Sequence, residues 1–313
     1  MARKVSSLEE HLDRLAELRG QAPSPEGRAE VGKSLSSKMN LPAAKAARIA
    51  GEWQAAELTP ELVAAFDRFM VKPETTDKRC AAKIEILKAL CKLEYSSPAI
   101  FRRGLQHVQM EPTWGGSVDT AAEVRALGAM GLAQTDYAEA LEEIVPLLLD
   151  PQRDARIGAA RALAVSGLPG AALLLRLKAL SGDEPDVLGE CLAALLRTEP
   201  AKSLEFVAKF LDHREEAVAE AAALALGDSR LENAFEVLRD AFQHTRAQPL
   251  RRTLLLAIAL LRRENAIDYL LDLVRDGEGQ NSADAVAALA MYEKDPNLQE
   301  RLDRARQSRS SIS

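Results

Sequence analysis

The stretch DPQRDARIGAARALAVSGLPGAALLLRLKAL, residues 150–180, predicts a helix, a tight turn and a second helix. Asp150 and Pro151 suit the start of the first helix, because an aspartate accepts hydrogen bonds from free N–H groups and proline has a helical φ. Apolar residues then recur at helical spacing until the sequence GLPG at 167–170 ends the helix. Two such helices cannot bury their apolar faces alone, so the stretch requires similar neighbours.

Similar pairs occur along most of the chain. An Ala-Leu-like step recurs with its alanine at positions 89, 129, 162, 194, 225, 259 and 288. The first interval is 40 residues, whereas the later ones are 33, 32, 31, 34 and 29. A helix pair that repeats every thirty-odd residues is typical of an α-solenoid, in which stacked pairs bury a continuous core.

Composition agrees with this all-α fold class. Hydrophobic residues make up 47% of the 313 residues but aromatic residues only 4%, which suits closely packed helices better than sheets. The formal net charge is −6; residues 1–118 carry 18 basic and 15 acidic side chains, and residues 119–313 carry 23 and 32. This balance does not favour nucleic-acid binding, and solubility alone accounts for charges of this size.

The cysteines and the N-terminus indicate a cytoplasmic protein. Cys80, Cys91 and Cys191 form no CxxC motif, and each lies in an apolar helical stretch, as reduced core cysteines do. The sequence has no run of 18 apolar residues, and its first residues lead directly into an amphipathic helix.

We expect about eight helix pairs in three segments. Residues 1–41 form an N-terminal helical cap, residues 42–306 form the repeat solenoid, and residues 307–313 form a disordered tail. The 40-residue interval contains the Pro- and Gly-rich sequence around Trp114, so residues 109–118 are interpreted as an inserted loop.

The repeats resemble the HEAT family, in its short bacterial form related to phycobilisome-lyase repeats. The resemblance rests on Asp150-Pro151, Ala155-Arg156 and the sequence AARAL at 159–163, together with Val124-Arg125. The units at 187–196 and 217–219 lack the arginine that follows the first apolar residue. The resemblance implies a curved superhelix in which the second helix of each repeat lines the concave side. Helix 154–166 would then be the second helix of its repeat and line that side.

Two enzyme families with HEAT-like repeats provide tests of an activity. Deoxyhypusine hydroxylases hold two irons with repeated His-Glu pairs, but none of the four histidines here, His11, His107, His213 and His244, precedes a glutamate. HEAT-like alkylpurine glycosylases embrace DNA with a basic groove, which acidic residues would interrupt here. No nucleophile or phosphate-binding motif is present either. We therefore expect no enzyme activity, catalytic residue, metal or cofactor.

Two features are candidates for partner contact, and each has a structural alternative. Trp114 in the inserted loop is either a binding anchor, because tryptophan is enriched in interface hot spots, or a plug for the gap that the insertion makes. Arg125 and Arg156 either contact a ligand or hydrogen-bond a neighbouring helix end. The full candidate set for partner binding is Trp114, Arg125, Arg156, Arg161, Glu216, Glu220, Arg251 and Arg252.

The sequence thus predicts a non-catalytic scaffold, adaptor or assembly factor that binds a protein partner on the concave surface. We expect no membrane contact, nucleic acid or small-molecule substrate. The alternative is a nucleic-acid-binding or DNA-repair protein, or an enzyme that acts on a protein partner.

Overall fold

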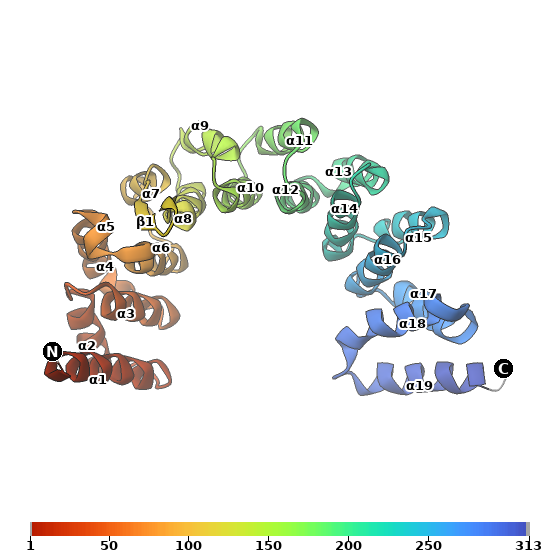
Figure 1. Cartoon of the computed structure of the whole chain (residues 1–313), viewed down its shortest axis with the longest axis horizontal. Helices are drawn as coiled ribbons and strands as arrows, with labels where there is room; N and C mark the ends of the chain where they lie inside the picture. Colours follow the sequence, from red (N-terminus) through yellow and green to blue (C-terminus); the bar gives the residue numbers. More distant parts are fainter. Residues whose placement is uncertain (1, 311–313) are drawn as a thin grey trace. The chain divides into compact units, whose positions relative to one another are not determined.

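The computed structural model describes residues 2–310 and the side chains of residues 8–308. It confirms an all-α solenoid, in which successive helices are stacked side by side (Figure 1). The chain divides into two compact units, unit 1 up to residue 171 and unit 2 from residue 172. No helix among the described residues is both long and apolar enough to cross a membrane.

Unit 1 contains most of the irregular elements. In chain order they are α1 (Ala2–Arg19), α2 (Pro25–Leu35), α3 (Asn40–Glu52), η1 (Ala56–Leu58), α4 (Thr59–Phe69), α5 (Pro73–Thr76), η2 (Lys78–Cys80), α6 (Ala81–Lys92), α7 (Pro98–Leu105), β1 (Met110–Thr113), β2 (Gly116–Asp119), α8 (Ala122–Ala133), α9 (Ala140–Ile144), η3 (Val145–Leu149) and α10 (Arg153–Ser166).

Unit 2 is more regular. Its elements are α11 (Ala171–Ser181), α12 (Pro185–Thr198), α13 (Pro200–Ala208), η4 (Lys209–Asp212), α14 (Glu216–Ser229), α15 (Ala234–His244), α16 (Gln248–Leu260), α17 (Glu264–Asp276), α18 (Gly279–Leu289), η5 (Ala290–Tyr292) and α19 (Pro296–Ser310).

Each unit has two layers of helices. In unit 1 the first row consists of α3, α6, α8 and α10, with each helix packed on the next, and α4 and α7 pack on it from the second layer (Figure 1). The N-terminal helices α1 and α2 pack on α3. In unit 2 the row consists of α12, α14, α16 and α18, while α13, α15 and α17 form the other layer.

Small residues allow the helices within a row to approach closely. A Cβ atom on Gly158 of α10 would lie 2.2 Å from the Cβ of Ala126 in α8. In unit 2, a Cβ on Gly227 of α14 would lie 2.4 Å from the carbonyl oxygen of Ala257 in α16. Neither position has room for a side chain, so the alanine- and glycine-rich composition sets the spacing of the rows.

Two sequence expectations need correction. The insertion at 109–118 is not an irregular loop, because it contains the antiparallel hairpin of β1 and β2. Its residues lack helical periodicity, and a two-residue connection at Trp114-Gly115 lets the chain pair with itself. Residues 307–310 of the expected disordered tail belong to α19, and residues 311–313 lie outside the described part of the chain.

Candidate partner-binding site

The β-hairpin is the feature that most distinguishes unit 1 from a plain stack of helices. Met110 pairs with Asp119, and Thr113 pairs with Gly116 next to the turn. A backbone hydrogen bond of 2.9 Å from the N–H of Thr120 to the carbonyl of Gln109 continues the pairing toward the base. The hairpin is thus part of the connection between α7 and α8.

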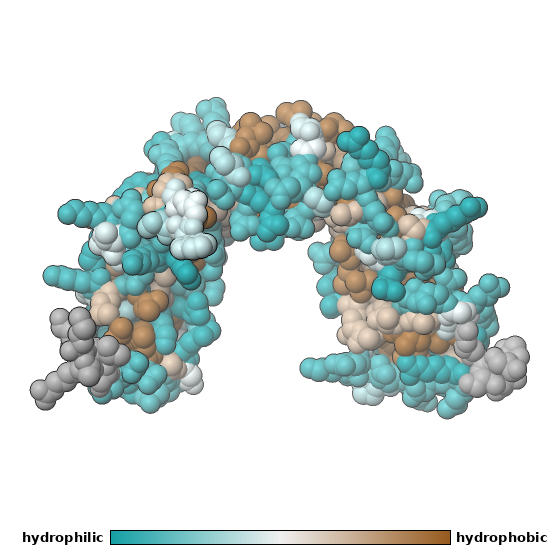
Figure 2. All heavy atoms as spheres, in the orientation of Figure 1, coloured by the Kyte–Doolittle hydropathy of each residue, from teal (hydrophilic) through white to brown (hydrophobic). Residues whose placement is uncertain are grey.

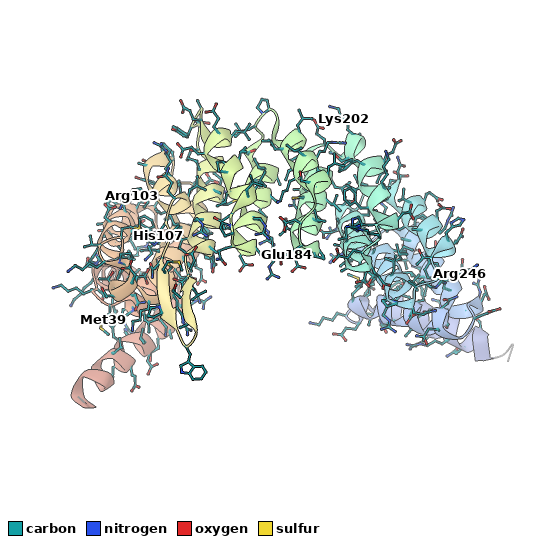
Figure 3. The ribbon with its side chains drawn as sticks, turned by 45° about the horizontal axis from the view of Figure 1, so that its top comes forward. Met39, Arg103, His107, Glu184, Lys202 and Arg246 are labelled. Carbon is teal, nitrogen blue, oxygen red and sulfur yellow. The ribbon has the colours of Figure 1, made fainter. Side chains whose placement is uncertain are left out.

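A buried glutamine secures the base of the hairpin. The side-chain oxygen of Gln109 lies 3.3 Å from the Cys80 thiol and 3.2 Å from His107 Nε2. Its amide nitrogen donates to the Asp77 carbonyl at 2.9 Å and to the Glu111 carboxylate at 2.6 Å. Because an amide has two donor hydrogens and two acceptor sites, the buried Gln109 amide is fully satisfied. His107, labelled in Figure 3, lies beside the foot of the hairpin.

The Glu111 carboxylate ties β1 to the segment before α6. Its Oε1 atom accepts hydrogen bonds from the backbone N–H of Arg79 at 2.6 Å and from the Thr120 hydroxyl at 2.9 Å, besides the Gln109 amide. Desolvation alone would raise the pKa of Glu111, but these hydrogen bonds outweigh it and the net pKa lies below the usual value.

Arg125 fastens the end of β2 to the next repeat. Its guanidinium lies 2.8 Å from Asp119 and forms a bidentate pair with Asp150 at 2.8 and 2.9 Å. It also donates to the His107 carbonyl at 2.9 Å. Arg125 is only 4% exposed, so its guanidinium is occupied in holding unit 1 together. These contacts are of the kind that the structural alternative predicts for Arg125, and contact with a partner stays a prediction.

Other buried polar groups below the hairpin are paired or uncharged. Lys83 and Asp77 pair at 3.0 Å with both side chains fully buried. Burial raises the pKa of the Cys80 thiol to about 11, so the thiol is protonated at neutral pH and is a poor nucleophile. Among the described residues, no group of three or more His, Cys, Asp or Glu side chains is arranged to hold a metal ion.

Above this anchored base, the hairpin exposes apolar side chains. Trp114 is 105% exposed at the turn, which overturns the alternative that it folds back as a plug. Met110, Val118 and the adjacent Val108 are between 44% and 58% exposed. In Figure 2 the hairpin, at the place of the β1 label in Figure 1, has a pale surface among hydrophilic neighbours. Because successive strand residues alternate between faces and paired residues share one, Met110 and Val118 lie on opposite faces, with Trp114 at the turn. Exposed apolar side chains on a preorganised support are typical of a binding element.

The first row of unit 1 also carries a groove, which we call the unit 1 groove. It consists of two adjoining clefts of about 390 and 470 Å³ that share Lys88 and Glu123. The first cleft involves α1, α3 and α6, and the second involves α6, α8 and α10. Its main apolar lining residues are Leu12, Leu41, Ile84, Leu127, Met130 and Ile157.

Ion pairs cross the first row from helix to helix. They are Arg19 with Glu52 at 2.6 Å, Arg48 with Glu85 at 2.9 Å, and Lys88 with Glu123 at 2.7 Å. Arg19 belongs to α1, which packs on α3, and the other two pairs each join one helix of the row to the next. These half-exposed pairs stabilise the stack modestly and give the groove a rim of alternating charge.

The arginines at the equivalent position of three repeats share one structural role. Arg156 donates to the carbonyl of Asp150 at 2.8 Å, just before its own helix α10. Arg251 donates to the carbonyls of Phe242 and Thr245, both at 2.7 Å, at the end of α15. With Arg125, each guanidinium thus binds carbonyl groups of the connection that precedes its helix.

The other residues predicted to bind a partner are Arg161, Glu216, Glu220 and Arg252, and each is more exposed than Arg125. Arg161 lines the unit 1 groove on α10. In unit 2, Glu216 accepts the Leu250 N–H at 3.3 Å, Glu220 accepts the Thr253 hydroxyl at 3.2 Å, and Arg252 pairs with Asp284 at 3.3 Å. The eight predicted residues are thus divided between the two units. Trp114, Arg125, Arg156 and Arg161 belong to unit 1, and the other four belong to unit 2.

Sequence reasoning missed the groove residues of α3 and α6. Arg48 is exposed and Lys88 is half-buried, and both belong to alanine- and leucine-rich helices without a distinctive motif. The signal that could have identified them is the interval of 37 residues between Arg48 and Glu85, close to one repeat, which brings opposite charges onto adjacent helices.

Comparisons with known proteins support the helical repeat class. Residues 173–259 match the family model for HEAT repeats. No curated protein has a sequence that matches this chain. Among solved structures, an engineered protein is 17% identical, with a TM-score of 0.39 and coverage of 96% of this chain and 95% of its own.

Two further solved structures are also similar. The complex of CpcE and CpcF of phycocyanin lyase from Nostoc sp. PCC7120 is 16% identical, with a TM-score of 0.38 and coverage of 91% of this chain and 94% of that chain. Human deoxyhypusine hydroxylase is 18% identical, with a TM-score of 0.29 and coverage of 94% and 97%. Likeness at this level carries no conclusion about activity.

The protein therefore belongs to the class of all-α helical repeat proteins. The resemblance to HEAT repeats is confirmed, and residues 173–259 are the part of the chain in which the family model matches.

Proposed function

We propose that this protein is a non-catalytic scaffold that binds a protein partner through unit 1, with the hairpin as the anchor and the unit 1 groove as an extended contact surface. The observation that carries the proposal is the complete exposure of Trp114 at the end of a hairpin whose base is fixed by buried hydrogen bonds. Within the described chain, the indole contributes nothing to the core.

The energetics favour a binding role for this arrangement. Burying one tryptophan side chain removes about 200 Å² from water, which corresponds to about 5 kcal/mol before the costs of association. Since the base is fixed already, binding need not order the hairpin first, and preorganisation of this kind raises affinity. A structural loop would gain more from turning the indole inward.

The unit 1 groove supplies the second part of the proposed contact. Its apolar floor is flanked by charges of both signs, including Arg161, Lys88 and Glu123. Such a rim orients a partner and penalises mismatched charges, while the apolar floor supplies affinity. Arg252 in unit 2, whose side chain is 64% exposed, remains a candidate for a further contact.

Site-specific photo-crosslinking tests the proposal. A photoreactive phenylalanine analogue replaces Trp114 in the full chain inside cells, and a second variant carries it at Val71, which is also exposed but lies outside the hairpin. We expect one protein to be crosslinked from position 114 and not from position 71. Equal, diffuse labelling from both positions, or labelling of nucleic acid instead, would contradict a protein-binding role.

A further inference from the structure

The two edges of the hairpin differ in whether their backbone N–H and carbonyl groups are free to pair with another chain. The bond from Thr120 N–H to the Gln109 carbonyl establishes which residue pairs exchange hydrogen bonds across the hairpin. Because such pairs alternate, Glu111 with Val118 and Thr113 with Gly116 are bonded pairs. The backbone groups of the intervening pairs, including Pro112 with Ser117, point outward to the two edges.

Pro112 makes the β1 edge a poor template. Proline has no N–H, and at this outward-pointing position it also places its ring where an added strand would lie. Proline on an edge strand is a common means of preventing unwanted strand addition.

The β2 edge carries no such block. Ser117 presents its N–H and carbonyl outward, and no other described residue forms a hydrogen bond to them. Gly116, Ser117 and Val118 are all exposed. An edge of this kind pairs readily with an extended chain, because its backbone groups already have strand geometry.

The surroundings of this edge indicate the chemistry of the added strand. Val118 offers an exposed apolar surface, and Trp114 lies at the adjacent turn. The Arg79 backbone binds Glu111, which faces the same side of the hairpin as its partner Val118. Lys78 and Arg79 are both exposed, and the structure shows no ion pair for either side chain. The hairpin therefore offers apolar side chains, and two exposed cationic residues adjoin it where the Glu111 carboxylate is already held by hydrogen bonds.

We propose that the β2 edge binds a short extended segment of a partner protein, rich in alternating apolar and acidic side chains, as a third strand of the hairpin. The inference rests on the proposed protein-binding function and specifies its mode. Hydrogen bonds to Ser117 would provide sequence-independent affinity, while Trp114, Val118 and the cationic residues would select the side chains.

The decisive variant is Ser117→Pro in the full chain. It removes an outward N–H without removing a bond between β1 and β2, whereas Ser117→Ala retains that N–H and is the matched control. The probe is a displayed library of random heptapeptides, selected on the wild-type protein. We expect the selected peptides to alternate apolar and acidic residues. Their binding should weaken at least tenfold with Ser117→Pro and stay unchanged with Ser117→Ala.

Amide hydrogen exchange supplies the second measurement. With a selected peptide bound, exchange at the Ser117 amide should slow at least tenfold. Peptides selected as amphipathic helices, or a Ser117 amide that exchanges at its free rate in the complex, would overturn strand addition. Concentration-dependent dimerisation that Ser117→Pro abolishes would overturn it too, because a second copy would then occupy the edge.

The two proposals can fail separately. If Trp114→Ala abolishes binding of the selected peptides while Ser117→Pro has no effect, the protein-binding function stands and the strand-addition mode is wrong. If neither substitution changes the binding of any selected peptide, the hairpin is not the site and both proposals fail.

Discussion

Gln109 shows how one buried side chain can determine the geometry of an exposed hairpin. Its amide connects a thiol and a backbone carbonyl of residues 77–80 with an imidazole and a carboxylate of residues 107–111. An amide buried in this way fixes the position of the chain because any displacement breaks several bonds together. The hairpin consequently begins at a defined point and in a defined direction.

Replacing Gln109 by leucine should destabilise the protein by about 3 kcal/mol or more, because it removes all four hydrogen bonds that the buried amide makes at the base of the hairpin. Urea denaturation of the full chain measures the free energy of unfolding. Gln106→Leu is the matched control, since Gln106 is exposed three residues earlier and should change stability by less than about 0.5 kcal/mol. Equal, small effects of both substitutions would show that the network below the hairpin contributes little.

The same network predicts a dependence of stability on pH. Burial lowers the pKa of His107 below its usual value of 6.5. For Glu111 and Asp119 desolvation acts to raise the pKa, but hydrogen bonds from neighbouring backbone N–H groups, among other contacts, lower it below the usual 4.5 and 3.8. In all three cases the unfolded chain binds protons more readily than the folded one, so stability falls as the pH falls.

We therefore expect the free energy of unfolding to decrease as the pH falls below 6.5, first through His107, and to decrease further below 4.5 through the carboxylates. Urea titrations across this range provide the measurement. His107→Gln removes the imidazole, so the decrease in the free energy of unfolding just below pH 6.5 should disappear, while the decrease below pH 4.5 should remain. A wild-type profile that is flat between about pH 7 and pH 5 would contradict a buried, neutral His107.

At the scale of the helix, small residues at row contacts decide whether the repeats can stack. Gly158 has no space for a methyl group against Ala126, and in α8 the Gly131 position is similarly filled by the ring of Phe101. These glycines lie within helices, where each destabilises the helix by about 1 kcal/mol relative to alanine. The close packing that they allow must therefore stabilise the fold by at least as much.

Gly158→Ala should therefore destabilise the protein by about 2 kcal/mol or more, although alanine is the better helix former. Thermal unfolding followed by circular dichroism measures the effect. Gly115→Ala is the control, because a Cβ there meets no atom within 4 Å. If Gly158→Ala raised the melting temperature, helix propensity would outweigh packing, and the close contact between α8 and α10 would be wrong.

The helix pairs were predictable because each one carries its own signal. In the stretch at 150–180, the turn GLPG and the spacing of its alanines correctly placed the boundary between α10 and α11. The hairpin was not predictable in the same way. Its strands are only four residues long, one contains Pro112, and the turn Trp114-Gly115 lacks the usual Asn-Gly or Asp-Gly signature.

The site was only partly predictable for a related reason. Trp114 stood out because large aromatic residues are rare in this chain. The role of Arg125 depends on Asp119 and Asp150, and its burial depends on how α7, α8 and the hairpin meet, which no local pattern reveals. Arginines that recur at one position of several repeats have the same spacing whether they stabilise the repeats or bind a partner, so spacing alone does not separate the two roles.

At the scale of the whole molecule, exposed apolar side chains occur in several places. In unit 1 they include those of the hairpin, and in unit 2 they include Leu173, Leu177 and Leu180 of α11, which are 71%, 62% and 70% exposed. The surface at the place of the α11 label is hydrophobic in Figure 2. The hairpin combines exposure with a hydrogen-bonded support, and we therefore assign partner binding to it rather than to α11.

The proposed role of this support is to present Trp114 to another protein. The most direct test is the affinity of Trp114→Ala for the partner identified by crosslinking, measured by calorimetry together with the free energy of unfolding. We expect at least a tenfold loss of affinity with an unchanged free energy of unfolding, because the indole is 105% exposed in the free protein. Unchanged affinity for that partner would contradict it.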